Sequence, residues 1–221
     1  MFTIKICGVT SVADAIGAAE AGADAVGLNF YPGSVRFVDT EQARQIVGAL
    51  PDSVAKVGVF VDAPVEQILA TVRQVALDWV QLHGDEPAES LAHLGEVKLI
   101  KAFRLAAADI APIVRYLADC RRDSRLPDAV LVDAYRPGQY GGTGQRAPWE
   151  ALAPPRDGLS DLPLILAGGL TPENIQQAIG QVSPAAVDTA SGVEQSPGQK
   201  SPQRMREFVR NARDAIAATP H

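Results

Sequence analysis

The sequence predicts an α/β protein with one domain over residues 1–221, a (βα)8 TIM barrel whose eight strands run parallel. Eight short runs of β-branched and aliphatic residues recur along the chain. Most are followed by a longer segment with helical spacing, which is typical of βα units around a parallel sheet. Such barrels commonly have roughly 200–250 residues in one domain, and this chain has 221. Hydrophobic residues make up 47% of the chain, enough to fill a core without disulfides.

The predicted strands are short apolar runs separated by polar or glycine-containing segments. In chain order they are Thr3–Cys7, Ala25–Asn29, Lys56–Val61, Trp79–Leu82, Leu99–Phe103, Ala129–Asp133, Leu164–Ala167 and Ala185–Asp188. Eight strands favour closure into a barrel. An open doubly wound sheet is the structural alternative, but it requires a glycine-rich dinucleotide-binding turn after the first strand. The segment Cys7–Thr10 does not supply one.

The predicted helices place alanine and aliphatic residues three and four positions apart. They are Val12–Ala21, Thr40–Leu50, Pro64–Val75, Pro87–Leu94, Ile110–Cys120, Pro172–Ile179 and Pro202–Ile216. Thr171 and Ser201 each precede a proline, which is the usual pairing of a cap residue with the first helical position. Only a short turn or two, Pro148–Leu152, follows the sixth strand, and a loop, Gln195–Lys200, precedes the last helix.

Charge and cysteine usage exclude several classes of partner. The formal net charge is -6 and no basic stripe is present, so duplex nucleic acid is a poor candidate. Cys7 and Cys120 lie far apart without metal-ligand spacing, which argues against a disulfide framework and a zinc site and favours a reducing cytoplasm. The sequence has no basic segment before a long apolar run and no stretch of about 18 apolar residues, so neither targeting nor membrane anchoring is expected.

Candidate functional residues stand where the predicted strands end. In a barrel of this kind, active sites form at the carboxyl ends of the strands and in the loops that follow them. Cys7 ends the first strand, Arg36 follows the second, His83 ends the fourth and Asp133 ends the sixth. The sequence therefore predicts that these four side chains meet at one mouth of the barrel.

Glycine-rich segments follow the last three predicted strands. Barrels often bind phosphate between the loops after strands seven and eight, where bare backbone N–H groups and helix dipoles favour an anion. A small phosphorylated substrate is therefore expected, although glycines of this kind can also serve only to make tight turns. The residues predicted to contact it in these loops are Gly142, Gly168, Gly169, Asp188, Ser191 and Gly192.

Cys7 and Asp133 form the predicted catalytic pair. A free cysteine often only packs in a core, but Gly8 leaves room for a substrate beside this thiol. A thiol becomes a base if its pKa falls from about 8.5 towards neutrality. Asp133 ends the apolar run Ala129–Val132, where a carboxyl group is costly unless it meets a partner, water or substrate. Asp133 either caps the following loop or donates a proton to the substrate.

Arg36 and His83 have two interpretations each. A guanidinium matches a carboxylate with two parallel hydrogen bonds, so Arg36 either binds a substrate carboxylate or is a solvated surface residue. His83 either shapes the pocket or hydrogen-bonds the neighbouring loop. Cys120 and His93 fall within or beside helices, where packing and surface roles are expected.

Five motifs in this order resemble those of the phosphoribosylanthranilate isomerase family of tryptophan biosynthesis, and the similarity runs from the first strand to the last helix. The motifs are Lys5–Gly8, Gln81–Gly84, Gly141–Gly144, Ala167–Leu170 and Ser191–Glu194. The resemblance implies that Cys7 is the general base and Asp133 the general acid of an Amadori rearrangement. It also implies that Arg36 holds the anthranilate carboxylate, that the glycine loops hold the phosphate, and that no metal or other cofactor takes part.

Three alternatives remain open from the residues. A histidine-pathway aminoaldose isomerase resembles this chain in its phosphate loops but has an aspartate where Cys7 stands. A metal-dependent pentose-phosphate epimerase needs histidine and acidic ligands at several strand ends, where this sequence offers only His83. A non-catalytic barrel that binds a phosphorylated ligand needs neither Cys7 nor Asp133. The barrel class is compatible with a monomer and with a homodimer.

Overall fold

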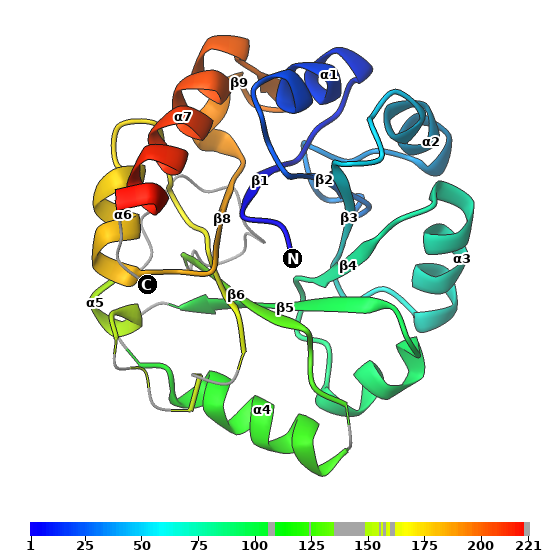
Figure 1. The fold of residues 1–221 in the computed structure, drawn as a ribbon. Coiled ribbons are helices and arrows are strands. Elements are labelled where there is room, and N and C mark those ends of the chain that lie inside the picture. The colour runs from blue at the N-terminus through cyan, green and yellow to red at the C-terminus, as the bar shows by residue number, and fades with distance from the viewer. Residues whose placement is uncertain are drawn as a thin grey trace.

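The computed structural model describes residues 1–105, 109–123, 125–134, 149–154, 156, 158–159 and 162–218. Eight parallel strands form a closed barrel in which each strand pairs with the next and β8 pairs with β1 (Figure 1). This closure confirms the predicted fold class. The strands are β1 Ile4–Cys7, β2 Ala25–Asn29, β3 Ala55–Phe60, β4 Trp79–Leu82, β5 Lys98–Leu105, β6 Ala129–Ala134, β7 Leu164–Leu166 and β8 Ala186–Thr189.

Helices surround the barrel, close to the positions that the apolar spacing predicts (Figure 1). Ser11 and Asp39 begin α1 and α2, because each side chain accepts a hydrogen bond from the backbone amide three residues later. The helices are α1 Val12–Glu20, α2 Thr40–Gly48, α3 Val65–Val75, the 3-10 helix η1 Ala88–Leu94, α4 Ala111–Arg122, α5 Trp149–Leu152, α6 Ile175–Val182, the 3-10 helix η2 Ser191–Val193 and α7 Pro202–Ala218.

Three elements differ from the sequence prediction. The helix expected from Pro172, with Thr171 as its cap residue, begins instead at Ile175, and Asn174 occupies the cap position. The segment expected to be an amphipathic α-helix, Pro87–Leu94, is the 3-10 helix η1, whose first turn closes with a bond from the Ser90 amide to the Pro87 carbonyl. The expected loop Gln195–Lys200 contains most of an antiparallel hairpin of β9 (Glu194–Ser196) and β10 (Gln199–Lys200). The sequence does not reveal this hairpin, because strands of three and two residues are too short to show alternation.

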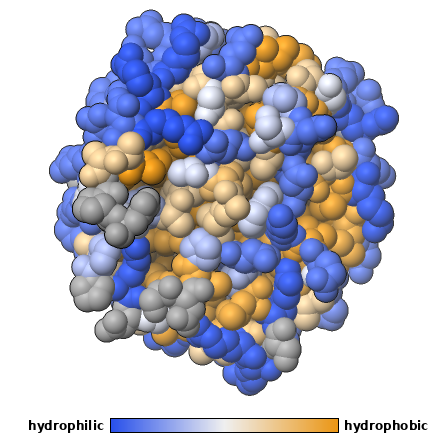
Figure 2. All heavy atoms as spheres, in the orientation of Figure 1, coloured by the Kyte–Doolittle hydropathy of each residue, from blue (hydrophilic) through white to orange (hydrophobic). Residues whose placement is uncertain are grey.

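Side chains alternate along the strands between the barrel interior and the helix layer. At the amino-terminal end of the barrel the interior is closed by Phe2, which packs edge-on against Trp79 with 5.7 Å between the ring centres. Figure 2 shows apolar residues in the middle of one face of the molecule and hydrophilic residues around most of its edge. Phe2 and Trp79 belong to an apolar cluster inside the barrel. Its other members are Ala25, Val57, Ile100, Ala102, Ala129, Leu131, Ile165, Ala167 and Ala186.

A second, larger apolar cluster joins the outer faces of the strands to the helices. Leu28 and Val130 lie in it, whereas their strand neighbours Ala25 and Leu131 face the interior. In the described part of the chain, no helix combines the length and apolar composition needed to cross a membrane.

Candidate active site

Cys7 ends β1 and its side chain lies beside Gly27 of β2. A Cβ atom on Gly27 would lie 2.6 Å from Cys7 Sγ and 3.1 Å from Lys5 Nζ, so the thiol and the ammonium border the space that this glycine leaves open. Burial raises the pKa of the Cys7 thiol above its ordinary value, and the opposing charge on Lys5 does not reverse this. A lowered pKa, which the sequence analysis sets as the condition for a thiol base, is therefore opposed by burial, and the role of Cys7 as the base stays a prediction.

Lys5 is a buried member of the site that was not predicted from the sequence. Its side chain is fully buried, and its Nζ donates a hydrogen bond of 2.8 Å to Asp188 Oδ1 across the β1–β8 pairing. Burial lowers the pKa of Lys5, but Asp188 and Cys7 together raise it above its ordinary value. A lysine within an apolar strand, two residues before a cysteine on the same face, is the signal that could have revealed it.

Asp133 and His83 meet at the carboxyl ends of β6 and β4. Asp133 Oδ2 lies 3.4 Å from His83 Nε2, and Asp133 Oδ1 accepts a 2.7 Å hydrogen bond from the Ala134 amide. Gln81 Nε2 donates to His83 Nδ1 at 2.8 Å. Because an amide nitrogen can only donate, a neutral His83 carries its proton on Nε2 and directs it towards Asp133. Gln81 is a second residue that sequence reasoning did not single out.

The loops after β7 and β8 enclose a small cavity of about 30 Å³. It is lined by Asp133, the segment Ala167–Leu170 and the segment Asp188–Gly192, so it includes Gly168, Gly169, Ser191 and Gly192. Thr189 Oγ1 ties the loops together by donating a 2.8 Å hydrogen bond to the Leu170 carbonyl. The structure therefore brings the glycine loops and the carboxyl group of Asp133 to one place.

Two of these glycines are required by the packing of the loops. A Cβ atom on Gly168 would lie 2.6 Å from the Ala134 backbone nitrogen, and Gly168 also has a positive φ of 84°. A Cβ atom on Gly192 would overlap the Leu170 carbonyl oxygen. Close approach of the two backbones thus depends on glycine in both loops. Gly142, the remaining glycine predicted to bind substrate, lies outside the described residues.

Arg36 does not stand free in solvent. Its Nε and Nη2 groups donate to the two carboxylate oxygens of Glu194 at 2.7 Å and 2.8 Å, and the two side chains are 11% and 5% exposed. Hydrogen bonding to Glu194 raises the pKa of Arg36. Lys200 Nζ donates to the same carboxylate at 2.9 Å and to the Ala190 carbonyl at 3.0 Å. Glu194 and Lys200 belong to the β9–β10 hairpin, so neither contact was expected from the sequence.

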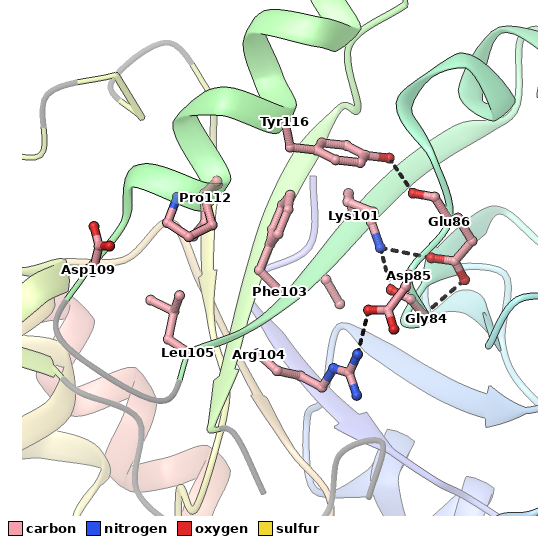
Figure 3. Close-up of a pocket in the computed structure, with 12 residues that line it drawn as sticks. Gly84, Asp85, Glu86, Lys101, Phe103, Arg104, Leu105, Asp109, Pro112 and Tyr116 are labelled. Atoms are coloured by element: carbon pink, nitrogen blue, oxygen red, sulfur yellow. Dashed lines mark hydrogen bonds and ion pairs between the residues drawn. The ribbon is translucent and has the colours of Figure 1, made fainter. Parts of the chain in front are cut away.

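A larger cavity of about 580 Å³ lies elsewhere, between β5 and α4 (Figure 3). A buried ion pair of Lys101 and Glu86, 2.8 Å apart, stands at one end, and the rings of Phe103 and Tyr116 form a wall. Side chains alternate along β5. Ile100 and Ala102 face the barrel interior, so Lys101 and Phe103 face the helix layer. This cavity contains none of the residues that the sequence predicts for the site.

The described residues include no group of three or more histidine, cysteine, aspartate or glutamate side chains placed to hold a metal ion. The polar side chains at the mouth of the barrel instead include two pairs and one group of three. Lys5 contacts Asp188, His83 lies next to Asp133, and Glu194 bridges its two cations. This arrangement suits proton transfer and anion binding.

Comparison with known proteins gives a consistent result over nearly the whole chain. The family model of N-(5'-phosphoribosyl)anthranilate isomerase matches residues 4–211. The N-(5'-phosphoribosyl)anthranilate isomerase of Geobacter sulfurreducens is 46% identical over 213 residues, which covers 96% of this chain and 99% of that protein.

Solved structures agree with the sequence matches. The crystal structure of phosphoribosyl anthranilate isomerase from Thermotoga maritima is 38% identical with a TM-score of 0.85, and the match covers 97% of this chain and 100% of that one. A second crystal structure, of a phosphoribosyl anthranilate isomerase in complex with reduced 1-(o-carboxyphenylamino)-1-deoxyribulose 5-phosphate, is also 38% identical with a TM-score of 0.82. That match again covers 97% of this chain and 100% of that one.

Proposed function

The chain belongs to the N-(5'-phosphoribosyl)anthranilate isomerase family of tryptophan biosynthesis, and on this premise we propose that Cys7 and Asp133 catalyse its isomerisation as general base and general acid. The substrate is N-(5-phosphoribosyl)anthranilate and the product is 1-(2-carboxyphenylamino)-1-deoxyribulose 5-phosphate. The reaction is an Amadori rearrangement, in which hydrogen moves within one molecule.

The observation that carries this proposal is the arrangement of the groups that lie between the acid and the base. Asp133 and Asp188 line the same cavity beside the glycine loops. Asp188 holds Lys5, and Lys5 shares the space above Gly27 with the Cys7 thiol. A sugar whose phosphate occupies the loops after β7 and β8 therefore has the carboxyl group and the thiol within reach.

The acid acts first. Asp133 donates its proton to the furanose ring oxygen, the bond from that oxygen to C1 breaks, and C1 becomes an iminium carbon bonded to the anthranilate nitrogen. The Cys7 thiol releases its own proton to solvent, and the resulting thiolate removes the proton from C2. The electron pair moves towards the iminium nitrogen to give an enolamine. Tautomerisation of the enolamine yields the ketone. The iminium nitrogen accepts the electrons, so the chemistry requires no external oxidant or reductant.

This order of steps suits a thiol whose pKa is raised by burial. Ring opening creates a positive charge one bond from the carbon that loses its proton, and a nearby positive charge favours the thiolate. Lys5 and Lys200 act in the same direction, because their charges lower the pKa of Cys7 against the effect of burial. The substrate itself thus helps to generate the base.

Binding groups lie at both ends of the proposed substrate. The backbone amides near Gly169 and Gly192 receive the phosphate, as glycine loops beside a helix start commonly do. Arg36 receives the anthranilate carboxylate through Nη1, since Nε and Nη2 donate to Glu194. All these residues belong to one chain, so a monomer and a homodimer serve the reaction equally well. A reducing cytoplasm keeps the thiol of Cys7 free.

The anthraniloyl group of the substrate is fluorescent, which provides a direct test. Freshly made phosphoribosylanthranilate is mixed with the protein, beside the aminoaldose of the histidine pathway as the competing substrate. Loss of the fluorescence with the first compound and no conversion of the second is the expected result. A stable bound signal without turnover would instead identify a binding protein, and turnover of the second compound alone would identify the other isomerase.

A further inference from the structure

Glu194 fixes the orientation of Arg36. Two parallel hydrogen bonds keep the Arg36 guanidinium group and the Glu194 carboxylate in one plane. Both side chains are mostly buried. The pair uses Nε and Nη2, and in the described part of the chain no hydrogen bond is formed by Nη1. Arg36 also packs over Gly8, where a Cβ atom would collide with the arginine side chain. Glu194 therefore determines which edge of Arg36 faces an incoming carboxylate.

Lys200 connects this ion pair to the loop after β8. Its side chain is fully buried, and its Nζ donates both to Glu194 Oε1 and to the carbonyl of Ala190. Ala190 directly precedes Ser191 and Gly192, which line the small cavity of the glycine loops. The Lys200 ammonium group thus contacts Glu194, which orients Arg36, and also the backbone of the loop after β8, which is proposed to bind phosphate.

The charges in this cluster do not cancel. Arg36 and Lys200 carry two positive charges against the single negative charge of Glu194, whereas the neighbouring Lys5 and Asp188 balance each other. Burial lowers the pKa of Lys200, which shows that its charge is costly in this cluster, and an anionic ligand at the open edge offsets such a cost. The carboxylate of the substrate supplies that negative charge, and the Glu194 carboxylate remains shared by the two cations.

We propose that Lys200 and Glu194 couple the two ends of the substrate site, so that an anion in the glycine loops strengthens binding of a carboxylate at Arg36 and the reverse. The proposal rests on the proposed function and assigns a positioning role to two residues of the β9–β10 hairpin. A shift of the Ala190 backbone when phosphate binds moves the Lys200 ammonium, and with it the carboxylate that orients Arg36. Coupling of this kind is reciprocal, because each ligand must change the affinity of the other by the same factor.

The test uses the two halves of the substrate as separate probes. Anthranilate is titrated into the intact protein and followed by its fluorescence, once in inorganic phosphate and once in sodium chloride of equal ionic strength. In the wild-type protein, phosphate is expected to tighten anthranilate binding by about fivefold or more. In Lys200→Met both probes still bind but the enhancement disappears, since Glu194 keeps Arg36 as a partner while the link to Ala190 is lost.

A matched control is offered by another buried lysine–glutamate pair in the described part of the chain. Lys101 is as buried as Lys200 and contacts Glu86 at 2.8 Å, but it lies between β5 and the helix layer and contacts neither Arg36 nor the loop after β8 (Figure 3). Lys101→Met is expected to keep the enhancement by phosphate. Should Lys200→Met fail to fold, Glu194→Gln tests the same link, because it removes the charge that the two cations share.

Each result decides the question. Independent binding of the two probes by the wild-type protein, or full enhancement in Lys200→Met or Glu194→Gln, would overturn the inference. Turnover of phosphoribosylanthranilate by the wild-type protein is measured separately. Turnover together with independent probe binding rejects only the coupling, whereas absence of turnover rejects the proposed function whatever the probes do.

Discussion

The mouth of the barrel has two sides that surround the proposed base and the proposed acid in different ways. On the side built by β1 and β8, the Cys7 thiol lies among charged groups, with Lys5 paired to Asp188 beside it. On the side built by β4 and β6, the Asp133 carboxyl group meets the Nε2 of His83 and a backbone amide. The side of Cys7 is therefore surrounded by an ion pair. On the side of Asp133, the contact with His83 depends on which imidazole nitrogen carries the proton.

The direction of each proposed proton transfer explains the difference. The thiol must become negative before it can remove a proton, and nearby ammonium groups favour that anion. The carboxylic acid must keep its proton until it meets the ring oxygen, which a nearby ammonium group would oppose. We therefore expect that the electrostatic surroundings of the two sides cannot be exchanged without loss of activity.

The largest effect is expected from removing either reacting group. Cys7→Ser and Asp133→Asn each lower kcat by roughly 10²–10⁴-fold, because a general base or acid contributes about that much. KM is expected to change little, since neither substitution alters the loops or Arg36. Steady-state kinetics by anthraniloyl fluorescence measures both parameters. Near-normal turnover of Cys7→Ser would reject Cys7 as the base, and near-normal turnover of Asp133→Asn would reject Asp133 as the acid.

The glycine loops border both sides of the mouth and are proposed to bind the phosphate. A negative charge in these loops should therefore raise KM more than it lowers kcat. Gly169→Asp is expected to raise KM by roughly 10–100-fold, since it replaces a charge-assisted contact to phosphate by repulsion. Gly169→Asn has the same shape without the charge and is the matched control. Equal KM values in the two variants would mean that shape, and not charge, determines the loss.

The ionic side predicts a change in the pH profile. In Lys5→Met/Asp188→Asn the cation beside the thiol is lost and no unpaired buried charge remains. Lys5 lowers the pKa of Cys7 through its charge and a hydrogen bond, whereas the charge of Asp188 raises that pKa by less, so loss of both side chains raises the pKa of Cys7 further. The rise of kcat/KM with pH therefore moves to higher pH. Activity at neutral pH falls by about tenfold if the midpoint of the profile moves up by about one pH unit.

That profile also depends on the other charges that act on or pack near Cys7. They come from Arg36 on the loop after β2 and Lys200 on β10. Lys101→Met serves as a control, because it removes a buried lysine from the outer face of β5. An unchanged pH profile in the double variant would exclude Lys5 and Asp188 from control of the thiol.

The smallest effect is expected on the side of the acid. Gln81→Met removes the donor to His83 Nδ1, so the ring is no longer restricted to the tautomer that directs Nε2–H towards Asp133. A loss of kcat of about tenfold is expected, at the low end of the range for residues that orient a functional histidine through a hydrogen bond. Nitrogen-15 chemical shifts of the imidazole measure the tautomer directly. A ring that keeps the Nε2–H tautomer in this variant would contradict the role of Gln81.

Local pattern along the chain was enough to predict the order of the eight barrel strands and the place of the groups that we propose to react. Eight apolar runs predicted the strand number, and the rule that sites form at the carboxyl ends of strands selected Cys7 and Asp133. Strand alternation and chain order do not depend on contacts between distant parts of the chain, which is why a single sequence suffices for both inferences.

Which charges meet, by contrast, depends on the closed barrel. Lys5 and Asp188 are 183 residues apart, and Arg36 and Glu194 are 158 residues apart. Closure of β8 onto β1 brings the first pair together, and the hairpin β9–β10 places Glu194 against the loop after β2. Burial, which raises the pKa of Cys7, likewise arises only when the barrel closes, so spacing along the chain gives no measure of it.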